Sequence, residues 1–268
     1  MRDKVVIITG GSSGIGFALA QKFGQEGSKI VITGRNSMEL ENAVNLLRSM
    51  SIEVIGVRAD VSVESDNQHM AKEAIRAYGR IDVLINNAGI TMRALFSEVD
   101  LSVVKKVMDI NFYGVLYATR YCLPEITKRR GHIVGISSIA GYRGLPGRTG
   151  YSASKFALNG FLEVLRTELL KSGVHVLTAS PGFTASNIRK RALSRDGSAQ
   201  GESPRDEGEM MSAEEVAHHI YRAVIRRKRS IVLTTQGKFA VFLNKWWPSL
   251  ADKLIYRELA KEPFSNLK

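Results

Sequence analysis

Short runs rich in Val and Ile alternate with longer amphipathic segments along most of the chain. The runs are KVVIITG, KIVITGR, EVIGVRADV, IDVLINNAG, GHIVGISS, GVHVLTASPG and SIVLTT. Continuous apolar runs of this length are typical of parallel strands that are buried on both faces of a sheet. Helices are expected between them, from about Ile15, around Leu40 and up to Tyr78. The pattern predicts an α/β fold, a doubly wound parallel sheet with helices on both faces.

A single domain over residues 1–268 is expected, because no linker or repeat interrupts the alternation before residue 188. With 268 residues, 44% of them hydrophobic, the chain can bury a sizeable core. Residues 189–212, RKRALSRDGSAQGESPRDEGEMMS, are rich in Gly, Ser and charge. We predict that this insertion is a mobile segment beside the substrate site.

Cysteine and histidine usage argues against disulfides and metal sites. A single cysteine, Cys122, excludes an internal disulfide and suits a reducing compartment. His218 and His219 are adjacent and would point to different sides of a helix, so we interpret the five histidines as surface residues and expect no metal. The sequence contains neither a secretory signal nor a long apolar run that could span a membrane. A cytoplasmic protein is expected.

The net charge of +12 is compatible with nucleic acid, an anionic membrane surface, an anionic cofactor or solubility alone. The densest basic run, RRKR at 226–229, has no interleaved aromatic residues and no accompanying nucleic-acid motif. A solvated basic surface explains this run better. We therefore expect no nucleic-acid partner.

The first apolar run ends in TGGSSGIG, which puts Gly10, Gly14 and Gly16 where the chain turns into a helix. Glycine suits such a turn because a side chain would keep the backbone away from a phosphate, and the helix N-terminus offers free N–H groups. The turn therefore predicts the dinucleotide cradle of a Rossmann fold. Its G-x-x-x-G-x-G spacing differs from the commoner G-x-G-x-x-G.

The stretch YSASK places Tyr151 and Lys155 one helical turn apart, a spacing that is common by chance. In this chain the pair occurs together with several other motifs. They are TGGSSGIG at 9–16, NNAG at 86–89, Asn111 in NFYG, Ser138 in SS, and PG at 181–182. In these motifs, which run in order across roughly the first 185 residues, the chain resembles the classical short-chain dehydrogenases/reductases.

The chemistry that this resemblance implies is the interconversion of a ketone and an alcohol, which needs a hydride and a proton. Tyr151 would be the general acid or base, and Lys155 would lower a phenol pKa that is ordinarily near 10. Ser138 would polarise the substrate carbonyl, and its spacing to Tyr151 fits the family pattern better than that of Ser137. The resemblance assigns Asn111 to a water-mediated proton relay with Lys155; alternatively, it satisfies a helix irregularity.

NADP is favoured over NAD as the cofactor. The second strand ends in ITGRN without an acidic residue to hold the ribose hydroxyls, and Glu39 is the nearest acid downstream. Arg35 suits a 2′-phosphate, with Ser12 and Asn36 as neutral donors; the alternative is that Arg35 is a solvated loop charge. By resemblance, Asp60 holds the adenine amino group, residues 87–89 line the ribose and nicotinamide side, and Thr184 meets the carboxamide. The full expected cofactor set is Gly10, Ser12, Ser13, Gly14, Ile15, Gly16, Arg35, Asn36, Asp60, Val61, Asn87, Ala88, Gly89, Tyr151, Lys155, Pro181, Gly182 and Thr184.

The helix predicted over residues 151–171 is apolar nearly all round, so it must be covered on both sides. The apolar residues are Phe156, Ala157, Leu158, Gly160, Phe161, Val164, Leu165, Leu169 and Leu170. The sheet covers one side and a second subunit would cover the other. Members of the family often associate through this helix, and we expect a homodimer or homotetramer.

The C-terminal extension, residues 238–268, has an apolar helical face made by Phe239, Phe242, Leu243 and Trp246. Lys238, Lys245, Lys253 and Arg257 flank it. Residues 238–260 could lie on a membrane surface as a basic amphipathic helix. The alternative is that they pack on their own domain or on a partner subunit.

The predicted function is that of an NADP(H)-dependent oxidoreductase that interconverts a ketone and a secondary alcohol. The extended C-terminus resembles members that act on lipid-like ketones, such as ketosphinganine reductases and relatives of hydroxysteroid dehydrogenases, so an apolar substrate is expected. The alternatives are a 3-oxoacyl-carrier-protein reductase and a non-catalytic nucleotide-binding or membrane-associated protein. The sequence does not name the substrate, because the residues that select it lie in loops at 91–95, 140–149 and 189–212.

Overall fold

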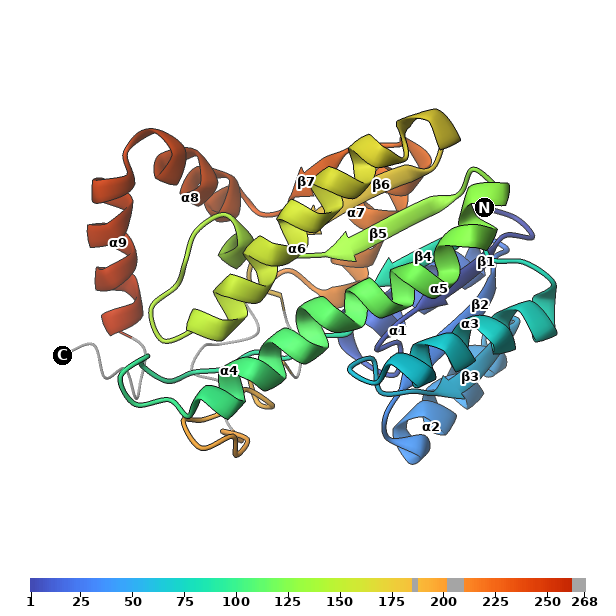
Figure 1. Cartoon of the computed structure of the whole chain (residues 1–268), viewed down its shortest axis with the longest axis horizontal. Helices are drawn as coiled ribbons and strands as arrows, with labels where there is room; N and C mark the ends of the chain where they lie inside the picture. Colours follow the sequence, from blue (N-terminus) through green and yellow to red (C-terminus); the bar gives the residue numbers. More distant parts are fainter. Residues whose placement is uncertain (185–187, 202–209, 262–268) are drawn as a thin grey trace.

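Seven parallel strands form one sheet, in the order β3-β2-β1-β4-β5-β6-β7 (Figure 1). The structure is a computed structural model that describes residues 1–184, 188–201 and 210–261. The strands are β1 Val5–Ile8, β2 Lys29–Gly34, β3 Val54–Arg58, β4 Val83–Asn86, β5 His132–Ile136, β6 His175–Ser180 and β7 Ser230–Val232. The sheet confirms the predicted parallel, doubly wound fold.

Helices cover both faces of the sheet. Val6 and Ile8 of β1 pack with α1 Gly14–Gln25, α2 Ser37–Ser49 and α7 Ala213–Ile225. Val5 and Ile7 point the other way and pack with α3 Glu64–Tyr78, α5 Gly114–Lys128 and α6 Thr149–Glu168. All four residues of β1 are fully buried, which explains why the run is continuously apolar rather than alternating.

The strand order reverses direction between β1 and β4, which are hydrogen-bonded neighbours. The loops that follow these two strands diverge, and in open α/β sheets this leaves a crevice at the carboxyl end of the strands. Gly10 turns the chain here with φ of +64°, and a Cβ on it would lie 2.9 Å from Cα of Ala88. A residue other than glycine would therefore be strained in the backbone and crowded against the loop after β4.

Two further helical segments flank the crevice. α4 Leu101–Met108 runs into α5 through a π-helical turn, η1 Asp109–Tyr113. α6 begins at Thr149, two residues before the predicted start, and a 3₁₀ turn, η3 Leu170–Ser172, follows it. A second 3₁₀ turn, η2 Ile139–Gly141, follows β5. Of the apolar residues of α6, Leu158 and Leu165 are buried, whereas Phe156 and Val164 are exposed on its outer side.

The C-terminal extension contains two helices, α8 Thr235–Trp246 and α9 Pro248–Ala260, so the expectation of one amphipathic helix was wrong. Pro248 has no backbone N–H to continue α8, and Trp247 adopts non-helical angles, φ −136° and ψ 66°. α8 packs beside η2, where Asn244 donates to the carbonyl oxygen of Tyr142 at 3.0 Å and accepts from Arg143 at 3.0 Å. Figure 1 shows that α8 and α9 project from the body of the sheet.

The apolar face predicted for this extension is mostly uncovered. Leu243 is buried, but the side chains of Phe239, Phe242 and Trp246 are 58%, 53% and 59% exposed. Packing on the domain therefore accounts for one of the four residues of the face. None of the helices in the described parts of the chain has the length and apolar character that a membrane crossing requires.

Not all the histidines are surface residues, in contrast to the prediction. His175 is buried and His132 is partly buried. They are register partners at the starts of β6 and β5, and their Nδ1 atoms lie 3.1 Å apart. Burial lowers the pKa of His132 to about 4 and also lowers the pKa of His175. Both imidazoles are therefore neutral at pH 7 in the folded protein.

Candidate active site

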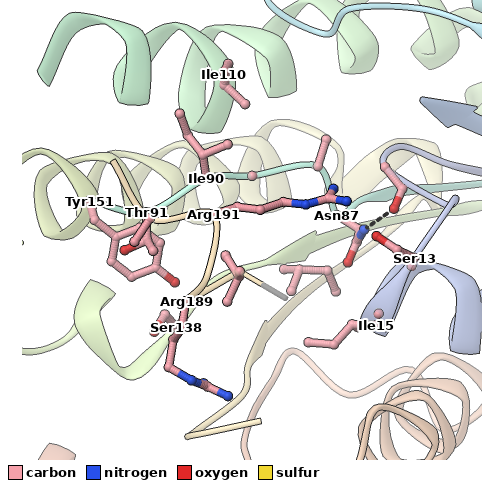
Figure 2. Close-up of a pocket in the computed structure, with 18 of the residues that line it drawn as sticks. Ser13, Ile15, Asn87, Ile90, Thr91, Ile110, Ser138, Tyr151, Arg189 and Arg191 are labelled. Atoms are coloured by element: carbon pink, nitrogen blue, oxygen red, sulfur yellow. Dashed lines mark hydrogen bonds between the residues drawn. The ribbon is translucent and has the colours of Figure 1, made fainter. Parts of the chain in front are cut away.

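A cavity of about 830 Å³ opens at the carboxyl edge of the sheet (Figure 2). Segments that follow β1, β2, β3, β4, β5 and β6 line it. Every residue predicted to bind the cofactor lines this cavity, and so does Ser138. Asn111 is the one residue of the predicted site that does not line it. The chain thus brings segments that are more than a hundred residues apart in sequence around one space.

The glycine turn and the loop after β4 are fixed to each other by hydrogen bonds. The Asn87 amide donates to the carbonyl oxygens of Thr9 and Gly10, at 2.9 and 3.0 Å. The Thr9 hydroxyl accepts from the backbone N–H groups of Asn87 and Ala88, both at 3.0 Å. The Asn87 side chain therefore holds the cradle in shape, and Thr9 is a supporting residue that the predicted cofactor set lacks.

The N-terminus of α1 faces the cavity through residues 13–16. Ser13 occupies the N-cap position without a side-chain capping hydrogen bond. The first N–H groups of a helix have no partner within the helix and carry a partial positive charge. This end of the cavity is therefore suited to a phosphate group.

Ser138, Tyr151 and Lys155 come together at the other end of the cavity. Figure 2 shows the Tyr151 hydroxyl pointing toward Ser138, with which it shares a hydrogen bond. The Lys155 ammonium is buried, donates to the carbonyl oxygen of Ile136 at 2.9 Å, and lies 5.7 Å from the ring centroid of Tyr151. Burial lowers the pKa of Lys155 to about 8.

The pKa of Tyr151 is raised rather than lowered. Burial of the hydroxyl is the largest cause, and it outweighs the hydrogen bond from Ser138 and the positive charge of Arg148, both of which favour the phenolate. The sequence predicted a pKa lowered by Lys155, but Lys155 is not among the groups that shift the pKa of Tyr151, and the cost of burial and the contribution of Arg148 were missed. Tyr151 is therefore protonated at neutral pH in this state, the form that a general acid needs.

Asn111 is fully buried in the π-helical turn η1. Its side chain accepts from the N–H of Ile90 at 2.8 Å, donates to the carbonyl oxygen of Ile90 at 2.9 Å, and donates to the Ser154 hydroxyl at 3.0 Å. It is also close to the site, because a Cβ on Gly89 would lie 3.2 Å from its Oδ1 and 3.7 Å from Nζ of Lys155. These contacts fit the alternative structural role. The relay with Lys155 stays a prediction.

The two serines after β5 differ in their surroundings. Ser138 accepts from the N–H of Ala140 at 3.2 Å and begins η2. The Ser137 hydroxyl is buried and has no hydrogen-bond partner among the described residues. Both line the cavity, so the choice of Ser138 rests on its hydrogen bond with Tyr151.

Charged side chains surround the end of the cavity that is formed by the residues following β2 and β3. Arg35 lies 3.8 Å from the Asp60 carboxylate and is 56% exposed. The carboxylate of Asp60 accepts from the N–H and the hydroxyl of Ser62, at 2.9 and 2.6 Å. The Asn36 carbonyl oxygen caps α2 by accepting from the N–H of Met38 at 3.0 Å, so only its amide N–H groups remain for a ligand. Glu39 also lines this end, although it was not in the predicted set.

Further lining residues were predicted only as loops, and the structure supplies their identities. They are Ile90, Thr91, Met92, Arg93, Lys106, Ile110, Leu145, Arg148, Phe183, Ile188, Arg189, Arg191, Ala192 and Leu193. Most of them fall in the loops anticipated from the sequence. Lys106 and Ile110 come from α4 and η1, and no sequence signal connected these elements to the site. Of the predicted insertion, residues 202–209 lie outside the described part of the chain.

A parallel sheet with a glycine turn at its switch point, and a Ser–Tyr–Lys group in the same cavity, defines a dinucleotide-dependent oxidoreductase. Residues 4–197 match the family model described as short chain dehydrogenase. The chain belongs to the short-chain dehydrogenase/reductase family.

Relatives from animals match nearly the whole chain. Dehydrogenase/reductase SDR family member 7B of Mus musculus is 35% identical over 268 residues, which are 98% of this chain and 83% of the relative. Dehydrogenase/reductase SDR family protein 7-like of Drosophila melanogaster is 32% identical over 253 residues, which are 92% of this chain and 78% of the relative. These matches extend well beyond the segment that the family model covers.

Solved structures share the fold and carry both types of cofactor. A short chain dehydrogenase/reductase from Burkholderia phymatum, in complex with NAD, has a TM-score of 0.82 and 27% identity over 93% of this chain and 95% of its own. An alcohol dehydrogenase from Thermococcus sibiricus, complexed with 5-hydroxy-NADP, has a TM-score of 0.76 and 22% identity over 87% of this chain and 96% of its own. The chain is thus an oxidoreductase of a family that uses nicotinamide cofactors, and the fold accommodates either one.

Proposed function

We propose that the protein is an NADP(H)-dependent oxidoreductase that interconverts a ketone and a secondary alcohol on an apolar, lipid-like substrate. The observation that carries this proposal is the meeting of Ser138, Tyr151 and Lys155 in a cavity whose opposite end holds the glycine turn. When bound, the nicotinamide cofactor supplies or accepts the hydride. The residues of the chain supply orientation, electrostatic stabilisation and the proton.

Tyr151 donates the proton to the developing alkoxide during ketone reduction. The raised pKa of its hydroxyl keeps it protonated before the reaction. Ser138, hydrogen-bonded to Tyr151, is positioned to donate to the same substrate oxygen as negative charge grows on it. In the reverse direction Tyr151 must lose its proton, and the charges of Lys155 and Arg148 together with a positively charged nicotinamide ring favour the phenolate.

The preference for NADP rests on Arg35. Its exposed guanidinium lines the cavity just after β2, where the ribose of a dinucleotide is bound in Rossmann folds. A guanidinium pairs with a phosphate through two parallel hydrogen bonds, which a ribose hydroxyl cannot match. The residues at this end fit a phosphate-bearing cofactor, although Glu39 also lies there and would favour NAD if it remained unpaired.

The preference for an apolar substrate rests on the lining of the catalytic end. Met92 and Leu193 are buried there and pack with Val103 and Val107 of α4 in a separate apolar cluster. Ile90 and Tyr151 pack against this cluster from the cavity side. This part of the wall gains from contact with hydrocarbon. Arg93, Lys106, Arg148 and Arg189 also line the cavity and suit a polar group on the same substrate.

Two further features support proposals on partners. Phe156 and Val164 are 47% and 57% exposed on the outer side of α6, an apolar surface that a second copy of the chain would bury in a homodimer or homotetramer.

On the extension, the exposed aromatic side chains of α8 lie beside Lys245, whose ammonium lies 5.5 Å from the centroid of the Trp246 ring. This combination supports peripheral contact with an anionic bilayer.

The proposed cofactor and substrate are tested by measuring the oxidation of NADPH and of NADH with a panel of 3-oxoacyl thioesters, ketosphinganine and ketosteroids. The proposal expects turnover with at least one lipid-like ketone and a higher kcat/KM with NADPH than with NADH. Activity confined to an acyl-carrier-protein thioester would show that the substrate is a 3-oxoacyl thioester and not a lipid-like ketone. A higher kcat/KM with NADH would overturn the cofactor assignment.

A further inference from the structure

In the segment after β6, residues 188, 189 and 191–193 line the cavity. The backbone of this segment is fixed beside the loop after β4. The N–H of Leu193 donates to the carbonyl oxygen of Thr91 at 2.9 Å, and the carbonyl oxygen of Leu193 accepts from the N–H of Arg93 at 2.8 Å. Ala192 and Leu193 are buried. The segment is therefore anchored at residues 192–193, and the side chain just before the anchor, Arg191, is 56% exposed in the cavity.

Arg191 spans the cavity. Figure 2 shows its side chain extended from near Thr91 toward Asn87 and Ser13 of the nucleotide cradle. Its guanidinium donates to the Glu39 carboxylate at 2.9 Å. Glu39 lies in the first turn of α2, three residues after Asn36 and four after Arg35. Arg191 thus reaches from the catalytic side of the cavity to the place where the 2′-phosphate of NADP is expected.

The formal charges at the nucleotide end of the cavity explain why a second arginine is needed to bind a 2′-phosphate. Arg35, Glu39 and Asp60 line it, one cation against two carboxylates, which leaves a net formal charge of −1. Arg191 brings that charge to zero. Arg58 lies just outside the lining, where its Nε donates to the carbonyl oxygen of Arg35 at 3.3 Å. A 2′-phosphate would be repelled by two carboxylates that face a single arginine.

The ion pair between Arg191 and Glu39 can be replaced by an ion pair between Arg191 and a phosphate. Both side chains are well exposed, at 56% and 40%, and exposed ion pairs contribute little to stability. A phosphate carries more charge than a carboxylate and offers several acceptor oxygens to the planar guanidinium. The same arginine can therefore leave Glu39 for a phosphate at small cost.

We infer that Arg191 is a second 2′-phosphate-binding residue, which exchanges Glu39 for the cofactor phosphate and joins Arg35 in selecting NADP over NAD. The inference rests on the proposed use of NADP(H). Glu39 then opposes NADP in the absence of Arg191 and holds the arginine in place before the cofactor binds. Cofactor choice would depend on a residue that lies 152 positions away from Glu39 in sequence.

The test is isothermal titration of adenosine 2′,5′-bisphosphate and of 5′-AMP, which differ only in the 2′-phosphate. Arg191→Gln is expected to weaken the bisphosphate about tenfold and to leave 5′-AMP unchanged. Glu39→Gln, which removes the same ion pair, is expected to tighten the bisphosphate severalfold. Lys190→Gln is the matched control, because Lys190 is the adjacent exposed cation and does not line the cavity.

The inference is supported if Arg191→Gln weakens binding of the bisphosphate and Glu39→Gln tightens it. It is overturned if both variants weaken the bisphosphate, which would make the pair a structural brace, or if Arg191→Gln weakens both nucleotides equally. It is also overturned if Lys190→Gln reproduces the loss. Wild-type protein that binds the bisphosphate no better than 5′-AMP would instead refute the proposed NADP preference, so the two failures are distinguishable.

Discussion

The Lys155 ammonium lies 5.7 Å from the ring centroid of Tyr151, on the same helix, and Lys155 is a buried residue of the cavity wall. This arrangement puts a cation next to a phenol whose pKa burial has raised. In the alcohol oxidation proposed above, Tyr151 would first lose its proton, so the arrangement matters most in that direction.

Replacing this cation is expected to shift the pH dependence of the reaction. In Lys155→Met the phenolate loses a neighbouring positive charge, so the pKa of Tyr151 rises. The acidic limb of kcat for alcohol oxidation should therefore move to higher pH, and kcat at pH 7 should fall. Full pH–rate profiles with saturating cofactor check this. A lower kcat with an unshifted profile would mean that Lys155 only supports the helix.

Arg35 is expected to discriminate between the two cofactors. Arg35→Asp should weaken NADPH at least about tenfold more than NADH, because the new carboxylate repels the 2′-phosphate and a guanidinium partner is lost. Equilibrium titration of each cofactor measures the ratio. Arg58→Asp is the matched control, since it makes the same change of charge just outside the cavity. Equal losses for both cofactors would reduce Arg35 to a surface charge.

The paired histidines predict a loss of stability in mild acid. The pKa of His132 is lowered to about 4 in the folded chain, whereas it is about 6.5 when unfolded. Stability from keeping this imidazole neutral is thus complete above pH 6.5 and is lost as the pH falls toward 4, because only the unfolded chain takes up the proton. Between pH 7.5 and pH 5 the contribution is about 2 kcal/mol.

Urea denaturation at the two pH values tests this claim. His132→Gln should reduce the drop in unfolding free energy, while His218→Gln, at an exposed position on α7, should leave it unchanged. Asp82, Lys4, Arg227 and His175 also act on His132, so those charges must stay intact in the comparison. The same drop in the His132 variant as in the wild type would show that other groups cause the acid sensitivity.

The exposed aromatic side chains of α8 predict binding to anionic vesicles. Cosedimentation with liposomes should rise with anionic lipid content and fall with added salt. Trp246→Ala should weaken it about tenfold or more, because burial of a large apolar side chain contributes about 1.5–3 kcal/mol. Met38→Ala on α2, which is also highly exposed, should have no effect. Failure of the full chain to bind in low salt would exclude the bilayer and leave a protein partner for this face.

The sequence predicted what local patterns encode and missed what depends on pairing across the fold. The Val/Ile runs, the glycine turn at Gly10 and the spacing of Tyr151 to Lys155 are local patterns. The runs form the strands, and the structure brings Gly10, Tyr151 and Lys155 to one cavity. His132 and His175 meet only because β5 and β6 pair in one register. Arg191 meets Glu39 only because Leu193 is anchored beside the loop after β4.

Burial was the other source of error. The charge of Lys155 could be read from the sequence, but the desolvation that raises the pKa of Tyr151 could not, since it depends on what surrounds the hydroxyl. In the extension, the apolar spacing from Phe239 to Trp246 does fall on one helix, but that helix ends before Pro248 and most of its apolar face is uncovered.

If Tyr151 is the proton donor in ketone reduction, Tyr151→Phe should bind NADPH as the wild type does and should have a kcat that is lower by about 10²–10⁴-fold, the usual contribution of a general acid. Steady-state turnover and equilibrium titration of NADPH measure the two quantities. Tyr142→Phe serves as the control, because Tyr142 is near the site but does not line the cavity. Substantial residual turnover by Tyr151→Phe, with NADPH still bound, would show that another group donates the proton.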